Sequence, residues 1–180
     1  DGNAVSLTPT INLGYGGGIL VAGAGFFLNN EMDDYSANPG APNSFGLIGN
    51  AANAIQPGKR PLSSMTPTIV LKNKEPFIIL GSPGGSRIIT AVLQTILNVT
   101  VHNMDIQEAV SAPRVHSQWL PDVIMAESYS IVKDVETSLI NKGHKILPYK
   151  NIGDVNAILI NEYGYFGGTD IRGENTAIGY

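Results

Sequence analysis

Two pairs of β-rich segments, each joined by a short polar turn, constrain the fold of this chain most strongly. A turn at residues 72–75 joins the first pair, and a turn at Asn161 and Glu162 joins the second, so each pair predicts an antiparallel hairpin. Antiparallel pairs with helical segments between them favour a layered α+β fold over alternating parallel βαβ units. The arms are residues 66–71 and 77–80 in the first hairpin, and 156–160 and 163–167 in the second.

Three helical segments lie between the two hairpins. Asp105 and Glu108 have the spacing of a capping box and predict a short helix that ends before Pro113. Residues 130–142 predict a further helix, with Gly143 as its C-terminal stop. The first helix follows the 66–80 hairpin, because apolar residues recur there with helical spacing at Ile88, Ile89, Val92, Leu93 and Ile96.

The first sixty residues carry weaker signals. Residues 1–3 (Asp-Gly-Asn) favour a tight turn, and residues 4–11 alternate enough to predict a strand after it. A hairpin turn needs two arms, so we expect the other arm to lie upstream, in a longer chain. Residues 26–28 predict a short strand. Residues 35–56 predict one long loop, and loops of this length are usually functional or mobile.

The composition indicates a single domain that needs a partner. The chain has 180 residues, of which 14% are charged and 43% hydrophobic, whereas an average soluble domain has about 25% charged residues. We therefore expect a second chain to cover part of the surface. The net charge of −4 creates no basic field that would attract nucleic acid or anionic lipid. The absence of cysteine excludes disulfides, thiolate chemistry and Cys-ligated zinc.

Two polar stretches have side chains that could bind a small molecule. Residues 29–34 (Asn-Asn-Glu-Met-Asp-Asp) crowd carboxylates and amides directly after an apolar segment. They could bind an ammonium group or a metal ion, or simply form a solvated exit from a strand, and the spacing of a calcium loop is not met. The adjacent hydroxyls of Ser63 and Ser64 could hold a carboxylate by hydrogen bonds, or be ordinary loop serines.

A third stretch, residues 81–86 (Gly-Ser-Pro-Gly-Gly-Ser), joins a predicted strand to a predicted helix. The N–H groups of Gly84 and Gly85 would be unobstructed at the positive end of that helix. The lysine of a phosphate-binding P-loop is absent and the glycine spacing of a dinucleotide site is not met. The stretch is therefore either an oxyanion hole or a tight turn.

Other residues with reactive or bulky side chains carry no functional pattern. His102, His116 and His144 are scattered without the spacing of metal ligands, so no metal site is expected, and each is interpreted as structural or exposed. Trp119, followed by Leu120 and Pro121, predicts a packing corner.

Taken in order along nearly the whole chain, these motifs resemble the small subunit of γ-glutamyltranspeptidases. That resemblance implies an N-terminal-nucleophile hydrolase with a four-layer αββα sandwich, which a large-subunit chain completes. Residues 1–180 would be a single domain, the small C-terminal subunit without its first strand. The motifs are Asp1 to Val5, Asn29 to Asp34, Lys59 to Met65, Pro67 to Val70, Gly81 to Ile89, Ala112 to Arg114 and Gln118 to Pro121.

The resemblance implies an enzyme, a γ-glutamyltransferase or glutathione hydrolase. A zymogen would cleave itself like a protease, and the new N-terminal threonine, upstream of Asp1, would carry the γ-glutamyl group. The substrates would be glutathione and other γ-glutamyl compounds, with water or an amino acid or peptide as acceptor and no cofactor. A periplasmic or secreted location is expected. The alternatives are a cephalosporin acylase or poly-γ-glutamate depolymerase on the same scaffold, or a non-catalytic γ-glutamyl-binding fragment.

The same resemblance assigns roles to individual residues. Thr10 would hydrogen-bond the nucleophile, and antiparallel pairing about the turn at residues 1–3 places that nucleophile roughly eight to ten positions upstream. Pro9 and Ile171 depart from the family pattern. The resemblance implies that Asn12, Glu31 and Asp34 bind the substrate's α-ammonium and that Ser63 and Ser64 bind its α-carboxylate. The N–H groups of Gly84 and Gly85 would stabilise the oxyanion, and Phe45 would be the aromatic residue of a lid.

Overall fold

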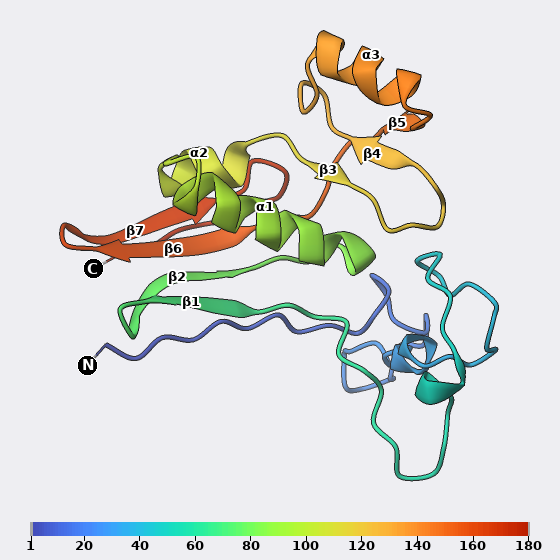
Figure 1. Cartoon of the computed structure of the whole chain (residues 1–180). Coiled ribbons are helices and arrows are strands. Elements are labelled where there is room, and N and C mark those ends of the chain that lie inside the picture. Colours follow the sequence, from blue (N-terminus) through green and yellow to red (C-terminus); the bar gives the residue numbers. More distant parts are fainter. Residues whose placement is uncertain (1, 180) are drawn as a thin grey trace. The chain divides into compact units, whose positions relative to one another are not determined.

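The computed structural model describes residues 2–179, which cluster into two compact parts (Figure 1). The first part, called here the sheet unit, contains residues 2–8 and 66–179. The second, called here the loop unit, contains Pro9–Met65. Asp1, the first residue of the predicted N-terminal turn, lies outside the described residues.

The sheet unit is built on a four-stranded antiparallel sheet with the strand order β1-β2-β6-β7. Both predicted hairpins are confirmed. In the first hairpin, Asn73 and Lys74 have φ of 54° and 71°, because the favoured two-residue hairpin turn needs positive φ at both central positions. The strands are β1 (Thr68–Lys72), β2 (Glu75–Gly81), β6 (Asn156–Asn161) and β7 (Gly164–Thr169).

The three predicted helices are confirmed as α1 (Ile88–Thr100), α2 (Ile106–Ser111) and α3 (Lys133–Asn141). Helix α3 begins three residues later than predicted. The capping box of α2 forms in both directions: the Glu108 N–H donates to Asp105 Oδ1 at 2.8 Å, and the Asp105 N–H donates to Glu108 Oε2 at 3.1 Å. Short helices need such caps because their first N–H groups have no partner within the helix.

Helices α1 and α2 cover one face of the sheet (Figure 1). Paired residues of neighbouring strands point to the same face, and Ile78 and Leu80 of β2 and Ala157 of β6 are buried on this one. Helix α2 lies so close to β7 that a Cβ on Gly168 would be only 2.8 Å from the Ile106 carbonyl oxygen. The core of the sheet unit therefore lies between this face and the two helices.

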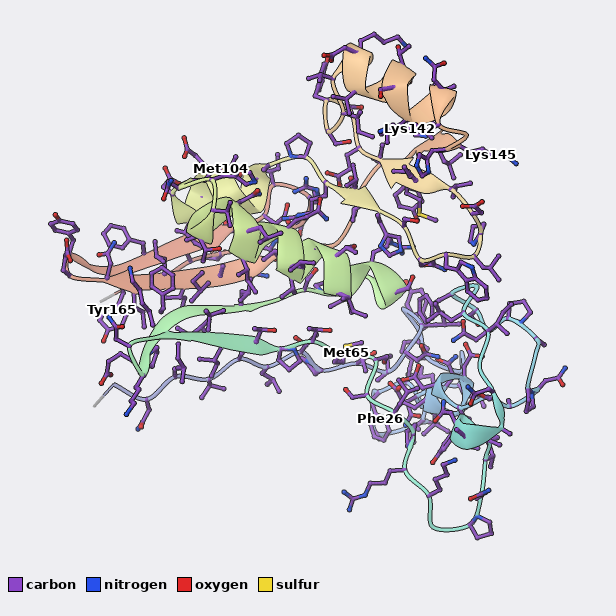
Figure 2. The ribbon with its side chains drawn as sticks, in the orientation of Figure 1. Phe26, Met65, Met104, Lys142, Lys145 and Tyr165 are labelled. Carbon is purple, nitrogen blue, oxygen red and sulfur yellow. The ribbon has the colours of Figure 1, made fainter. Side chains whose placement is uncertain are left out.

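The opposite face of the same sheet leaves apolar side chains in water. Ile69 and Ile158 are 41% and 44% exposed, and Tyr165 on β7 (labelled in Figure 2) is 74% exposed. Of the four layers of an αββα sandwich, the described residues thus supply one helix layer and one sheet layer, which agrees with the α+β class.

A second, three-stranded sheet was not predicted. Strands β4 and β5 are parallel and are joined through α3, which makes one βαβ unit in a fold otherwise built from antiparallel pairs. Strands of two or three residues are too short to show alternation, so no periodic signal could predict them. The strands are β3 (Val115–His116), β4 (Ile124–Ala126) and β5 (Ile146–Pro148).

Two strand predictions near the N-terminus are wrong. Residues 4–11 form no strand; the Ser6 hydroxyl instead donates to the Leu80 carbonyl and accepts from the Thr68 N–H. This segment is thus fixed to the hairpin by a side chain and not by a backbone ladder. Residues 26–28 contribute only a single bridge between Phe27 and Leu20.

The long-loop prediction for residues 35–56 is confirmed except for one short 3-10 helix, η2 (Ala51–Asn53). None of the helices in the described range combines the length and the apolar character that crossing a bilayer requires.

Four buried charged side chains join the two sheets of the sheet unit. Arg114, which is 1% exposed, pairs with Asp170 at 2.8 Å between Nη1 and Oδ2. Arg172 pairs with Asp170 and with Glu127. Burial raises the pKa of Asp170, but the Val155 N–H and the Arg114 guanidinium outweigh it, so its pKa lies below the ordinary value. We call these four residues the buried charge network.

Asp170→Asn should destabilise the assembled protein by about 3–5 kcal/mol, because the buried guanidinium of Arg114 loses its partner. The folded-state pKa of Asp170 is depressed. The stabilisation of the folded state by ionised Asp170 is therefore complete above the unfolded-state pKa of about 4, and it is lost as the pH falls through the folded-state pKa. Urea unfolding between neutral and acidic pH should show a smaller acid-dependent loss in the variant. A destabilisation below about 1 kcal/mol would contradict this role.

Candidate active site

Two carboxylates of the loop unit meet because of the local backbone. Glu31 and Asp34 are the first and last residues of the 3-10 helix η1 (Glu31–Asp34). A 3-10 helix has three residues per turn, so side chains three apart lie directly above one another. The sequence Glu-Met-Asp-Asp thereby places Glu31 and Asp34 on one side of the turn and Asp33 on another.

The Glu31–Asp34 pair brings two carboxyl groups together and leaves one of their oxygens without a hydrogen-bond partner. Burial raises the pKa of Glu31, and the neighbouring Asp34 carboxyl raises it further. Among the described residues, Glu31 Oε1 is buried and has no hydrogen-bond partner. A buried acceptor without a partner costs free energy that a bound cation or donor would recover. The pair is therefore suited to bind a group that has both positive charge and N–H donors.

Asp34 is held in place by two residues from later in the loop unit. The Ser64 hydroxyl donates to Asp34 Oδ2 at 2.8 Å, and Asn53 Nδ2 donates to the Asp34 carbonyl at 2.7 Å. Ser64 has one hydroxyl proton, and Asp34 takes it in this arrangement. Ser63 is exposed, and its hydroxyl makes only long contacts with Met65, at 3.3 and 3.4 Å.

Thr10 and Asn12 form a small turn, called here the hook, which is hydrogen-bonded to the acidic stretch at residues 29–34. The Asn12 N–H donates to Thr10 Oγ1 at 2.8 Å, and Asn12 has a φ of 72°, a conformation that asparagine tolerates better than most residues. Asn12 Nδ2 donates to the Asn30 carbonyl, and Asn30 Oδ1 accepts from the Leu13 N–H. Asn30, directly before Glu31, therefore connects the hook to the carboxylate pair.

Phe45 lies in the long loop, close to the other carboxylate of η1. Its N–H donates to Asn43 Oδ1 at 3.0 Å, and the neighbouring Ser44 N–H donates to Asp33 Oδ2 at 3.1 Å. Asp33 therefore fixes the loop that carries Phe45, while Asp34 faces Ser64. Adjacent aspartates thus have different structural tasks.

Gly84 and Gly85, called here the glycine turn, belong to the sheet unit. Their φ values of 141° and 60° favour glycine, and they lead into the 3-10 helix η3 (Gly85–Arg87) and then α1. The carbonyls of Gly84 and Gly85 accept from the Arg87 and Ile88 N–H groups. Within the described residues neither glycine N–H donates a hydrogen bond, so both are available to an oxyanion.

The structure therefore brings Thr10, Asn12, Glu31, Asp34 and Ser64 into one bonded neighbourhood of the loop unit. The glycine turn belongs to the other unit, and its convergence with these residues stays a prediction, as do all the assigned roles. Sequence reasoning missed the supporting roles of Asn53 and Asp33. The packing-corner prediction for Trp119 is wrong, because this side chain is 77% exposed.

The arrangement of motifs agrees with a family-wide sequence comparison. A profile of the family described as Gamma-glutamyltranspeptidase matches residues 1–180. The chain belongs to the γ-glutamyltranspeptidase family. It is 46% identical over 173 residues to the glutathione hydrolase proenzyme of Escherichia coli (strain K12), covering 96% of this chain and 30% of that protein. The chain thus spans about 30% of the length of such relatives.

Solved structures of this family are close in fold. The chain is 56% identical to a mutant γ-glutamyltranspeptidase of Helicobacter pylori, with a TM-score of 0.91 over 96% of this chain and 95% of that one. A cephalosporin acylase from Bacillus halodurans is more distant, at 28% identity and a TM-score of 0.77 over 91% of this chain and 29% of that one. The N-terminal-nucleophile hydrolase fold predicted from the motifs is confirmed.

Asp34→Asn should lower the pKa of Glu31, because the substitution removes a neighbouring carboxyl that raises it. Asp33→Asn is the matched control, since Asp33 faces Ser44 and should leave the Glu31 pKa unchanged. Carboxyl ¹³C NMR titration of the assembled protein measures both. Equal Glu31 titration curves in the wild type and Asp34→Asn would show that the two carboxylates do not interact.

Proposed function

We propose that this chain is the small subunit of a γ-glutamyl transferase/hydrolase that acts on glutathione and related γ-glutamyl amides. The proposal is supported by membership of the γ-glutamyltranspeptidase family and by relatives named glutathione hydrolase proenzymes. One observation within this chain carries it: the Glu31–Asp34 pair, with a buried oxygen that lacks a partner. A γ-glutamyl head group brings an α-ammonium, which supplies a positive charge to the pair and an N–H donor to the unpartnered Glu31 oxygen.

The rest of the head group is assigned to neighbouring residues. The α-carboxylate binds Ser63, whose hydroxyl makes only weak contacts, and Ser64, which must share its proton with Asp34. Asn12 provides a further polar contact to the ammonium side. Phe45, on the loop fixed by Asp33, covers the bound substrate.

The chemistry is acyl transfer through a threonine upstream of Asp1. Its hydroxyl oxygen adds to the γ-carbonyl carbon while its own α-amine takes the hydroxyl proton. The oxyanion is stabilised by the N–H groups of the glycine turn, and Thr10 hydrogen-bonds the nucleophile. The C–N bond then breaks, the leaving amine takes the proton, and water or an acceptor amine attacks the γ-glutamyl ester.

A large subunit from the same precursor is the proposed partner. The chain spans about 30% of the proenzymes it resembles. Its accessible surface of 11,827 Å² also exceeds the roughly 10,000 Å² of two separately folded bodies of this size. The uncovered sheet face with Ile69 and Ile158 is the surface proposed for the second sheet of the sandwich. A periplasmic or secreted location stays a prediction.

The alternatives are less well supported. A cephalosporin acylase is related at 28% identity, against 56% for a γ-glutamyltranspeptidase. A non-catalytic binding fragment would need no nucleophile. The sequence upstream of Asp1 in the precursor therefore distinguishes such a fragment from a catalytic subunit. The resemblance to the family expects a threonine roughly nine residues before Asp1. Another residue type there would overturn the catalytic proposal.

Asp34→Asn should weaken transition-state binding of a γ-glutamyl anilide by about 2–5 kcal/mol, because the variant loses one charge of a desolvated pair. The measurement is kcat/KM of the assembled heterodimer. Asp33→Asn is the control that keeps the net charge of the loop unit equal to that of Asp34→Asn. Equal losses in the two variants would mean that charge alone, and not the Glu31–Asp34 pair, determines the effect.

Ser63→Ala should raise KM, since a hydrogen bond to a carboxylate contributes about 1.5–3 kcal/mol. A substrate analogue without the α-carboxylate should be unaffected by this substitution, so its disadvantage against the parent should shrink. Ser64→Ala should impair both compounds, because Ser64 also holds Asp34. An unchanged ratio between analogue and parent in Ser63→Ala would remove Ser63 from the carboxylate site.

A further inference from the structure

The glycine turn is followed by a chain of hydrogen bonds that no assigned role explains. The Ser86 hydroxyl, one residue after Gly85, lies 2.6 Å from Gln118 Oε1. His116 Nε2 lies 2.9 Å from the same oxygen, and His116 Nδ1 lies 2.8 Å from Thr90 Oγ1. Thr90 is in the first turn of α1. This series of contacts therefore runs from Ser86, just before α1, through Gln118 and His116 to Thr90 in the first turn of α1.

The direction of the two bonds to Gln118 follows from the orientation of its amide. Gln118 Nε2 donates to the Leu120 carbonyl at 2.9 Å, so Oε1 is the acceptor that faces Ser86 and His116. His116 Nε2 therefore donates to Gln118 Oε1. The Thr90 hydroxyl donates to the Arg87 carbonyl at 3.1 Å and also lies 2.8 Å from His116 Nδ1. Gln118 Oε1 receives two hydrogen bonds in a mostly buried setting, where His116 is 3% exposed. A single side chain thus orients two donors.

Gln118 itself is held by a strained turn. The Leu120 N–H donates to the Gln118 carbonyl at 2.9 Å, which closes a three-residue turn around Trp119 at a φ of 73°. This positive-φ form of the γ-turn is rare and strained. Trp119 is 77% exposed, so burial of its ring does not hold the turn. Strained residues persist where surrounding bonds over-determine them, which occurs most often at functional positions.

The strand that carries this turn is clamped to α1 independently. Gln94 of α1 donates from Nε2 to the Val115 carbonyl at 2.8 Å, and its Oε1 accepts from the Val115 N–H at 3.0 Å. Val115 precedes His116 in β3. The position of Gln118 is thus fixed relative to α1, the helix that follows the glycine turn. Its hydrogen bond to Ser86, called here the brace, therefore restrains Ser86 from a fixed position.

We propose that Gln118 is a positioning residue that holds the glycine turn through Ser86 and so aims the two glycine N–H groups. The inference rests on the oxyanion role that the proposed function gives to this turn. Glycine backbones have wide conformational freedom, and the backbone bond from the Arg87 N–H to the Gly84 carbonyl is long, at 3.3 Å. A side-chain brace at the next residue supplies the restraint that this turn lacks.

The test uses the assembled heterodimer and a γ-glutamyl anilide, with kcat normalised to the processed small subunit. Gln118→Ala and Ser86→Ala should each lower kcat by roughly 10- to 100-fold, as misplaced catalytic groups do, while KM changes by less than about twofold. The double variant should be no slower than the slower single variant, because both substitutions break one link. Gln107→Ala is the matched control, since Gln107 similarly clamps Thr169 but does not contact the glycine turn; its kcat should be unchanged.

The outcomes separate the inference from the proposed function. A wild-type heterodimer that does not turn over the anilide overturns the proposed function. Turnover by the wild type with an unchanged kcat in Gln118→Ala overturns the brace alone. If Gln118→Ala fails to assemble, Gln118→Met keeps the volume without the hydrogen bonds. Hydrogen exchange adds a readout without substrate: the Arg87 amide, which donates to the Gly84 carbonyl, should exchange faster in Ser86→Ala. Equal exchange rates would also overturn the brace.

Discussion

The sheet unit depends on the buried charge network of Arg114, Glu127, Asp170 and Arg172. Isolated charges of this burial would be costly, and each is stabilised only by its partners. The network also satisfies backbone groups, since Glu127 accepts from the Arg114 and Ile152 N–H groups. It thereby ties the short sheet, the end of α2 and the segment before β6 to one another.

The same network reaches the proposed oxyanion site through the backbone. Gly153 follows Ile152, and a Cβ on Gly84 would lie 3.2 Å from the Gly153 Cα. The Ser82 hydroxyl accepts from the Asp154 N–H at 2.8 Å, which fixes the approach to the glycine turn on its other side. The turn is therefore held between a charge-stabilised segment and the side-chain brace that starts at Ser86. Both supports act on a backbone whose own preferences are weak.

The regular elements could be predicted because their signals are local. The turn at Asn73 and the capping box of Asp105 and Glu108 each specify structure within a few residues. The short strands β3 to β5 could not be predicted, because two or three residues contain no period. The N-terminal segment showed the pattern of a strand but lacks a ladder, since an alternating pattern specifies extended backbone and not its partner.

In the candidate site, the acidic pair and the two serines could be predicted as polar stretches and by resemblance. Their supports could not: Asn53 reaches Asp34 from 19 residues away, and Gln118 reaches Ser86 from 32. Amide side chains at such separations follow no sequence period. The network around Arg114 was invisible for the same reason, because its members are single charges in unrelated segments.

The loop unit is ordered by backbone hydrogen bonds of isolated turns and bridges, and by amide and hydroxyl side chains that cap nearby backbone groups. Its only helices are η1 and η2, of four and three residues, so no cooperative ladder protects its amides. Segments of this kind open at a lower free energy than sheets with buried apolar cores. A ligand that satisfies Glu31 and Asp34 together would cross-link η1 to the later loop residues and so suppress this local opening. Part of the binding free energy of such a ligand is then used to order the loop unit. The measured affinity therefore depends on the stability of the whole loop unit as well as on the contacts with Glu31 and Asp34.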